Sequence, residues 1–158
     1  MRKLLLIMGD LATGKSTFAK ILSMRYNTNV FFKDSIKEVL GDTIGFSNRE
    51  ENKKLSSATM ELMFFIFSEF GKLNKNLILE SNFHTAELER LHKIAFENNY
   101  EVLTLVLRGD VEILHKRYLN RMDKIFAKVD FPVAKSPIIS NNLLISYSPL
   151  IFSSASSL

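Results

Sequence analysis

Short, continuous apolar runs alternate along the chain with longer segments in which apolar residues recur every three or four positions. Runs of this length are typical of strands covered on both faces, as in a parallel sheet. The longer segments have the spacing of amphipathic helices. We expect strands at residues 3–8, 30–32, 76–80 and 101–107, and helices at residues 15–26, 35–41, 47–72, 85–98 and 111–125. This alternation is the βαβ pattern, which predicts an α/β fold with a parallel sheet.

Polar residues mark the expected starts of three helices. Ser35 with Glu38, and Ser47 with Glu50, have the spacing of capping boxes. Thr85 precedes another helical segment and is expected to be its N-cap.

The pattern becomes irregular beyond residue 128. All three prolines of the chain lie there, and residues 142–145 offer only a weak fifth strand. We therefore expect a single domain over residues 1–158, in which residues 129–158 match the pattern poorly.

The segment between the first strand and the first helix reads Gly-Asp-Leu-Ala-Thr-Gly-Lys-Ser over residues 9–16. In this context G-x-x-x-x-G-K-S is typical of a P-loop, whose backbone N–H groups and following helix N-terminus surround a phosphate. Lys15 is then expected to reach the β- and γ-phosphates and the Ser16 hydroxyl to ligate Mg²⁺. The alternative is a glycine-rich turn with a solvated lysine. The residues predicted to bind nucleotide are Gly9, Leu11, Ala12, Thr13, Gly14, Lys15, Ser16 and Thr17.

Composition narrows the class of protein. The chain has no cysteine, which excludes disulfides and thiolate catalysis and makes the cytoplasm the natural compartment. Its longest apolar stretch, residues 62–67, is too short to span a bilayer, so we expect no membrane partner. The net charge of +4 is spread along the chain, so a nucleic-acid partner is allowed but not indicated. The oligomeric state stays open.

GTPase signatures are absent. Residues 42–45 have the Asp-x-x-Gly spacing but follow a helix rather than a strand. Residues 74–77 read Asn-Lys-Asn-Leu, with Leu77 where a guanine-reading carboxylate is needed. A GTPase is therefore disfavoured.

Asp34 directly follows the second expected strand, close to the carboxyl edge of the sheet, where ligands of such folds bind. A carboxylate there can accept the proton of a hydroxyl that attacks the γ-phosphate. Its alternative role is helix capping. Because Ser35 and Glu38 already form a capping box, the sequence favours a catalytic base at Asp34.

Glu80 closes the third expected strand, in the position of a Walker B carboxylate. It can hold a Mg²⁺-bound water or orient the acceptor. Ser81, Asn82 and His84 follow it and are candidates to line the acceptor site, although an ordinary loop histidine is the simpler interpretation of His84.

Arg117 and Arg121 are separated by four residues and share one face of a predicted helix. Two guanidinium groups presented together suit the spread negative charge of phosphoryl transfer. Spacing alone favours a solvated basic face, because surface arginines are common.

Taken in order, the motifs resemble a known family. They are the N-terminal P-loop, Asp34 in FFKDSIKEVL, Glu80 in LILESNF, and the segment LRGDVEILHKRYLNR, and together they cover about residues 2–124. This chain is similar to the AAA-type small P-loop kinases, which include zeta-toxin-like, chloramphenicol phosphotransferase-like and polynucleotide-kinase-like proteins.

The resemblance implies a three-layer αβα fold with a parallel sheet of about five strands in the order 2-3-1-4-5. It also implies ATP and Mg²⁺ as cofactors, Asp34 and Lys15 as catalytic residues, and Arg117 and Arg121 as lid arginines. The expected function is transfer of the γ-phosphoryl group to a hydroxyl of a small molecule. Two alternatives are a kinase of polynucleotide 5′-hydroxyls and a non-catalytic ATP-binding regulatory module. This chain differs from the family pattern in two places: Glu80, where the family more often has aspartate, and the segment beyond residue 128, which matches the family poorly.

Overall fold

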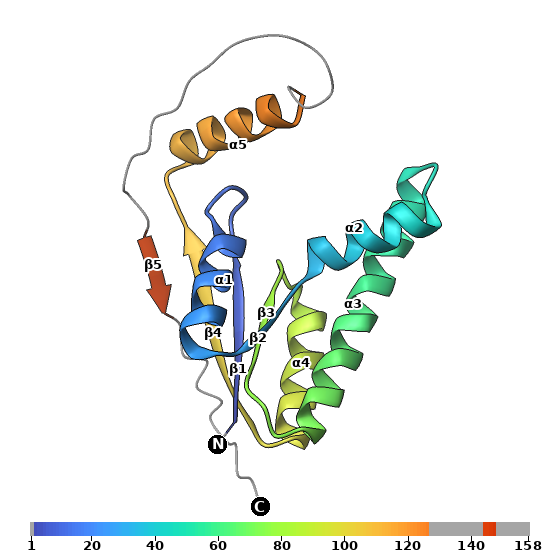
Figure 1. Ribbon diagram of the computed structural model, residues 1–158, viewed down its shortest axis with the longest axis vertical. Helices are drawn as coiled ribbons and strands as arrows, with labels where there is room; N and C mark the ends of the chain where they lie inside the picture. The colour runs from blue at the N-terminus through green and yellow to red at the C-terminus, as the bar shows by residue number, and fades with distance from the viewer. Residues whose placement is uncertain (1, 127–143, 148–158) are drawn as a thin grey trace, which may run out of the picture.

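The computed structural model describes residues 2–126 and 144–147, with side chains described for residues 2–120. Helices flank a five-stranded sheet whose strand order is β2-β3-β1-β4-β5 (Figure 1). The strands are β1 (Arg2–Gly9), β2 (Asn29–Phe32), β3 (Leu77–Glu80), β4 (Tyr100–Arg108) and β5 (Leu144–Tyr147). The helices are α1 (Lys15–Tyr26), α2 (Lys33–Ile44), α3 (Arg49–Lys72), α4 (Thr85–Glu97) and α5 (Val111–Phe126).

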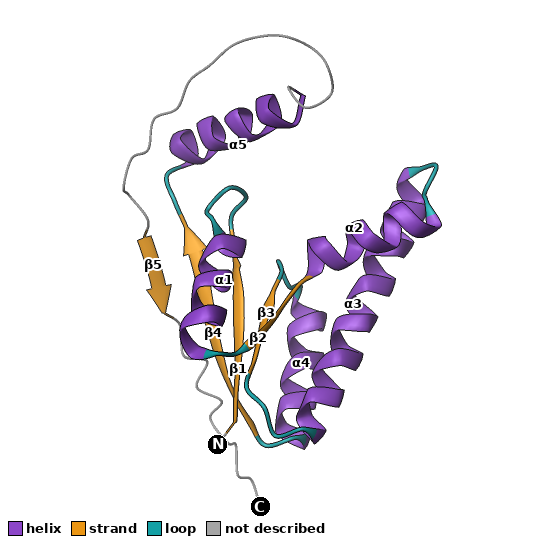
Figure 2. Ribbon diagram, viewed as in Figure 1, coloured by secondary structure: helices purple, strands orange, loops and turns teal. Residues whose placement is uncertain are grey.

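The sheet separates two cores because successive strand side chains point to opposite faces. Leu4 and Leu6 of β1 belong to the larger core, to which α3 contributes Met63 and Phe67. Ile7 belongs to the smaller core, together with residues of α1. Figure 2 shows α1 on one side of the sheet and α3 with α4 on the other. The expected three-layer α/β architecture is confirmed.

The strand order is the expected one, but one strand direction differs. Strands β1 to β4 are parallel, as predicted. β5 pairs antiparallel with β4, with Leu144 opposite Arg108, and it starts two residues later than the weak strand expected at residues 142–145. The short apolar pattern of a strand carries no information on its direction, which depends on how the chain returns to the sheet.

The register brings the carboxyl ends of the central strands to one edge. Phe32 at the end of β2 lies opposite Glu80 at the end of β3, and Glu80 lies opposite Ile7 near the end of β1. Gly9 in turn lies opposite Leu107 of β4. The loops that follow these strands therefore meet at this edge, where open α/β sheets bind their ligands.

The caps expected at Ser35, Ser47 and Thr85 are displaced. α2 begins at Lys33, directly after β2, so Ser35 lies inside its first turn and is not a cap. The cap of α3 is Asn48, whose side chain accepts the Glu51 N–H at 2.9 Å; it is not Ser47. The first residue of α4 is Thr85, and its N-cap is His84, whose N–H donates to the Glu87 carboxylate. For α3 and α4 the prediction misplaced the cap by one residue, because neighbouring polar residues offer more than one register of the same pattern. For α2 the helix begins directly after β2, and its N-cap is the apolar Phe32.

None of the helices within residues 2–126 combines the length and apolar character needed to cross a bilayer.

Candidate functional site

The loop after β1 is fastened at its first residue. Gly9 has φ +136°, and a Cβ placed on it would lie 1.9 Å from the carbonyl oxygen of Leu107. The next residue, Asp10, donates its N–H to that same carbonyl at 3.1 Å. Only glycine fits this close approach of two backbones. The first glycine of the motif is therefore required by the contact between the loop and β4.

The rest of the loop turns through left-handed backbone conformations. Ala12 has φ 63° and Gly14 has φ 88°, and Gly14 is the N-cap of α1. The buried Thr13 between them donates its hydroxyl proton to the Asp10 carbonyl at 2.8 Å. Such turns leave backbone N–H groups unpaired at a helix N-terminus, where they favour an anion. The loop has the backbone form that the P-loop motif predicts.

Lys15 folds back over this loop. Its Nζ donates to the carbonyl oxygens of Gly9 and Asp10, both at 2.9 Å. The side chain is partly buried rather than extended into solvent. The alternative interpretation of Lys15 as a solvated lysine in an ordinary turn is therefore not supported. The ammonium group can exchange these two carbonyl oxygens for the oxygens of a phosphate held by the loop.

Ser16 and Glu80 meet across the site. The Ser16 hydroxyl donates to Glu80 Oε2 at 3.0 Å, although the two residues are 64 positions apart in the chain. Glu80 is 4% exposed. A hydroxyl and a carboxylate oxygen side by side are the donor types that Mg²⁺ prefers. The residues thus fit the expected metal pair, which would hold Mg²⁺ together with water and phosphate oxygens.

Two charged groups, Lys15 of α1 and Asp34 of α2, act on Glu80. Burial raises the pKa of its carboxyl above the ordinary value of 4.5. The Ser16 hydrogen bond and the Lys15 charge lower this pKa, and the Asp34 charge raises it, but burial dominates. Asp34, Lys15 and Glu80 are therefore close enough to interact electrostatically, although β2, β1 and β3 bring them together from distant parts of the chain.

Replacing Glu80 with glutamine should stabilise the ligand-free protein at neutral pH. The raised pKa means that the folded state binds a proton more tightly than the unfolded state, so the native protein loses stability as pH rises through and above 4.5. Glutamine carries no charge to bury and still offers an oxygen to the Ser16 hydroxyl. The melting temperature of Glu80→Gln should exceed that of the native protein at pH 7 and approach it near pH 4.

The exposed Glu38→Gln is the matched control and should not change the pH dependence of melting. In Glu80→Gln the gain in nucleotide affinity on adding Mg²⁺ should fall by about tenfold or more, since a ligand to the ion or to its water is lost. A lower melting temperature for Glu80→Gln at pH 7 would contradict the burial argument.

Asp34 lies in the first turn of α2 and is exposed. A carboxylate there interacts favourably with the positive end of the helix dipole. The sequence argument for a catalytic Asp34 assumed that Ser35 and Glu38 form the capping box of this helix. That capping box does not exist, since Ser35 is not a cap. The support for Asp34 now comes from its position, at the carboxyl edge of β2 and within electrostatic reach of Glu80.

The arginine helix is present, but its contacts with the loop stay a prediction. Asp110 Oδ1 accepts the N–H groups of Glu112 and Ile113, at 2.9 and 3.1 Å, and so caps α5. Arg117 is partly buried on this helix, and the helix backbone continues through Arg121, whose side chain lies outside the described part. Figure 1 shows α5 beyond the end of the sheet that carries the loop after β1.

The structure also locates the candidates for the acceptor site and the remaining residues of the expected nucleotide-binding set. His84 is the N-cap of α4, and its role in the acceptor site stays untested. Asn82 contacts the loop itself, because its Oδ1 accepts the Gly9 N–H at 3.1 Å. This contact was not predicted. Leu11 and Thr17 of the expected nucleotide-binding set are exposed at the loop. Among the residues whose side chains are described, no cluster of three or more histidine or acidic residues forms a separate metal site.

Comparison with known proteins identifies the fold. No family model and no curated protein matches the sequence. A solved structure from Chloroflexus aurantiacus, provisionally assigned as a kinase, matches with a TM-score of 0.74 and 24% identity, over 79% of this chain and 69% of its own. The PezAT toxin–antitoxin structure from Streptococcus pneumoniae matches with a TM-score of 0.63 and 18% identity, over 81% of this chain and 55% of its own.

A third similar structure is the APS kinase of Mycobacterium tuberculosis in complex with AMPPNP and APS. It matches with a TM-score of 0.57 and 12% identity, over 83% of this chain and 76% of its own. These likenesses agree with the resemblance of the sequence motifs, and the chain has the fold of the small P-loop kinases.

Proposed function

We propose that this protein is an ATP-dependent kinase that transfers the γ-phosphoryl group to a hydroxyl of a small molecule. The observation that carries the proposal is the meeting of four side chains at one sheet edge. Lys15 lies over the phosphate loop, Ser16 donates to Glu80, and Asp34 is within electrostatic reach of Glu80. A loop that only binds phosphate needs no second carboxylate at this edge.

Each side chain has a distinct role in this proposal. Lys15 and the backbone from Leu11 to Ser16 bind the phosphates and hold the γ-phosphate in line for attack. Mg²⁺, held by Ser16 and Glu80, would neutralise charge on the phosphate oxygens. Asp34 accepts the proton of the attacking hydroxyl.

The proposal also covers the arginines of α5 and the identity of the phosphoryl donor. Arg117 and Arg121 are on the helix that follows β4 and are proposed to stabilise the charge on the transferring group. The APS kinase with a similar fold is solved with AMPPNP, an ATP analogue, which supports ATP as the donor here.

The surroundings of Asp34 favour a small acceptor over a polynucleotide. Glu38 and Asp42 are four and eight residues further along α2, so they lie on the same helix face as Asp34. All three carboxylates are exposed. Lys37, three residues from Asp34, lies beside this face, so the face carries more carboxylates than lysines and disfavours a phosphate backbone. A polynucleotide kinase needs a basic groove that leads to its base. The proposal therefore retains a small-molecule acceptor.

The proposal is tested with γ-labelled ATP and Mg²⁺. The native protein is incubated with sugars, amino alcohols, nucleosides and 5′-hydroxyl oligonucleotides, and labelled products are separated from ATP. Label should pass to at least one small hydroxyl compound, and Asp34→Asn prepared in the same way should lose that transfer. Transfer only to oligonucleotides would establish the polynucleotide alternative. Tight ATP binding with no transfer to any hydroxyl would establish the non-catalytic alternative.

A further inference from the structure

Glu80 and Asn82 contact the two ends of the phosphate loop, and Ser81 between them pairs with β1. The Glu80 side chain accepts the Ser16 hydroxyl where the loop enters α1. The Ser81 N–H donates to the Ile7 carbonyl of β1 at 3.1 Å. The Asn82 side chain accepts the Gly9 N–H at 3.1 Å, where the loop begins. The end of β3 and the residues directly after it thus contact both ends of the loop.

Asn82 is exposed, but its position is fixed by its neighbours. Ser81 and Phe83 on either side are each 6% exposed. Since the Gly9 N–H is a donor, the atom of Asn82 that faces it must be the carbonyl oxygen, and the amide nitrogen points away from Gly9. The side chain therefore contributes one specific acceptor to the loop.

The peptide groups of Gly9 are held from two sides. Asn82 accepts its N–H, and Lys15 donates to its carbonyl oxygen at 2.9 Å. In the proposed function Lys15 moves to the phosphates when nucleotide binds, and the Gly9 carbonyl then loses this partner. The Asn82 contact does not involve Lys15 and needs no rearrangement. Together with the contact of Asp10 to Leu107, it keeps the start of the loop in place.

We infer that Asn82 is a positioning residue that fixes the first peptide of the phosphate loop while Lys15 exchanges its contacts from the loop carbonyls to the phosphates of a bound nucleotide. This role rests on the proposed function, and it predicts a loss of nucleotide affinity that exceeds any loss of fold stability. A side chain that merely fastens β1 to its neighbour would affect stability alone.

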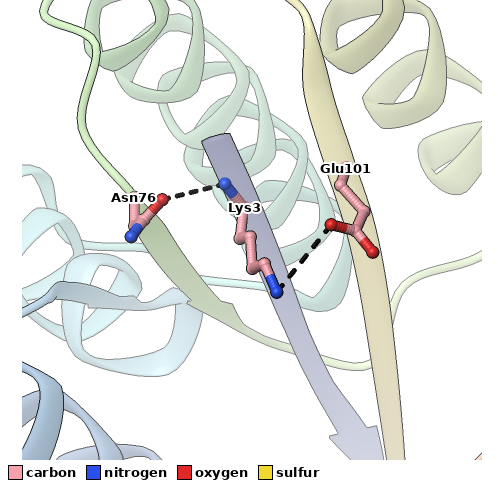
Figure 3. A network of polar contacts seen from close by, with 3 residues as sticks. All are labelled: Lys3, Asn76 and Glu101. Carbon is pink, nitrogen blue, oxygen red and sulfur yellow. Dashed lines mark hydrogen bonds and ion pairs between the residues drawn. The ribbon is translucent and has the colours of Figure 1, made fainter. Parts of the chain in front are cut away.

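The chain contains a matched control for this distinction. Asn76 immediately precedes β3, and its Oδ1 accepts the N–H of Lys3 at 2.9 Å, at the start of β1 (Figure 3). The two asparagines thus make the same kind of hydrogen bond to opposite ends of the same strand. Asn76 lies far along β1 from the phosphate loop, next to the ion pair of Lys3 with Glu101.

The test compares Asn82→Ala with Asn76→Ala. Each variant loses one hydrogen bond of an exposed side chain, so both should melt about 2 to 4 °C below the native protein. Only Asn82→Ala should bind AMPPNP with Mg²⁺ more weakly, by about tenfold, in calorimetric titrations. Hydrogen exchange of the Gly9 amide should stay slow in nucleotide-bound native protein and become fast in nucleotide-bound Asn82→Ala.

The possible outcomes separate the two proposals. Equal AMPPNP affinity for the native protein and Asn82→Ala would overturn the positioning role and leave the proposed function standing. An equal loss of affinity in Asn76→Ala would also overturn it, because strand fastening would then explain both. A native protein that does not bind AMPPNP would overturn the proposed function, and the role of Asn82 with it.

Discussion

Asp34→Asn should lower the rate of phosphoryl transfer by about 10² to 10⁴ while leaving AMPPNP affinity within about twofold of the native value. The side chain lies in the first turn of α2 at the carboxyl edge of the sheet, and its charge acts on Glu80. Asparagine keeps the size and polarity of the side chain but cannot accept the hydroxyl proton. The expected loss is therefore in turnover, since the phosphates are bound by the loop after β1 and not by α2.

The measurement is a steady-state assay with the acceptor found by the labelling screen, beside calorimetric binding of AMPPNP. Glu38→Gln is the matched control, because it removes an exposed carboxylate from the same face of α2 one turn further on. It should change turnover by less than about twofold. Unchanged turnover in Asp34→Asn would remove this residue from the mechanism, and a parallel loss of AMPPNP binding would indicate a structural role.

The sequence predicted the phosphate loop because both of its determinants are local. A buried apolar strand leads into Gly9, and helical spacing follows Ser16, so motif and context agree within one short segment. The Ser16–Glu80 contact was also predictable, since a carboxylate at the end of a neighbouring parallel strand must lie near the loop. The strand order came from the resemblance of motifs, and all five strands follow it, although only β1 to β4 are parallel.

The errors concern features that local patterns do not determine. Ser35 has the spacing of a cap, but the helix had already begun at Lys33, because β2 runs into α2 without an intervening turn. That error removed one argument for Asp34, and the position beside Glu80 supplied another. The direction of β5 depends on how the chain returns from α5 to the sheet, and no pattern within Leu144–Tyr147 records it.

The contact of Asn82 with Gly9 needed the three-dimensional register. The two residues are 73 positions apart, and they meet because Ile7 pairs with Glu80. A shift of one residue between β1 and β3 would turn Asn82 away from the loop, so its position within LILESNF predicts only that it lies near the site. Register is therefore what distinguishes an acceptor-lining asparagine from one that holds the loop.

Lys15→Ala should weaken AMPPNP binding by about 100-fold and abolish detectable transfer. In the ligand-free protein the ammonium group makes two hydrogen bonds to the carbonyls of Gly9 and Asp10. In the proposed complex it exchanges these for charged contacts with phosphate oxygens, each worth about 1.5 to 3 kcal/mol, which corresponds to about one to two factors of ten in affinity. Lys20→Ala is the control, because it removes the same charge from the next turn of α1.

Lys20 lies over the Phe32 ring, 5.7 Å from its centre, and makes none of the loop contacts, so its variant should bind AMPPNP within about threefold of the native value. Calorimetric titration of both variants at low and at physiological salt separates a specific phosphate contact from a general loss of positive charge. A general effect would be equal in the two variants and would disappear with added salt. If Lys15→Ala keeps native affinity at both salt concentrations, the loop does not bind nucleotide phosphates in the proposed way, and the roles derived for Ser16, Glu80 and Asp34 fail together.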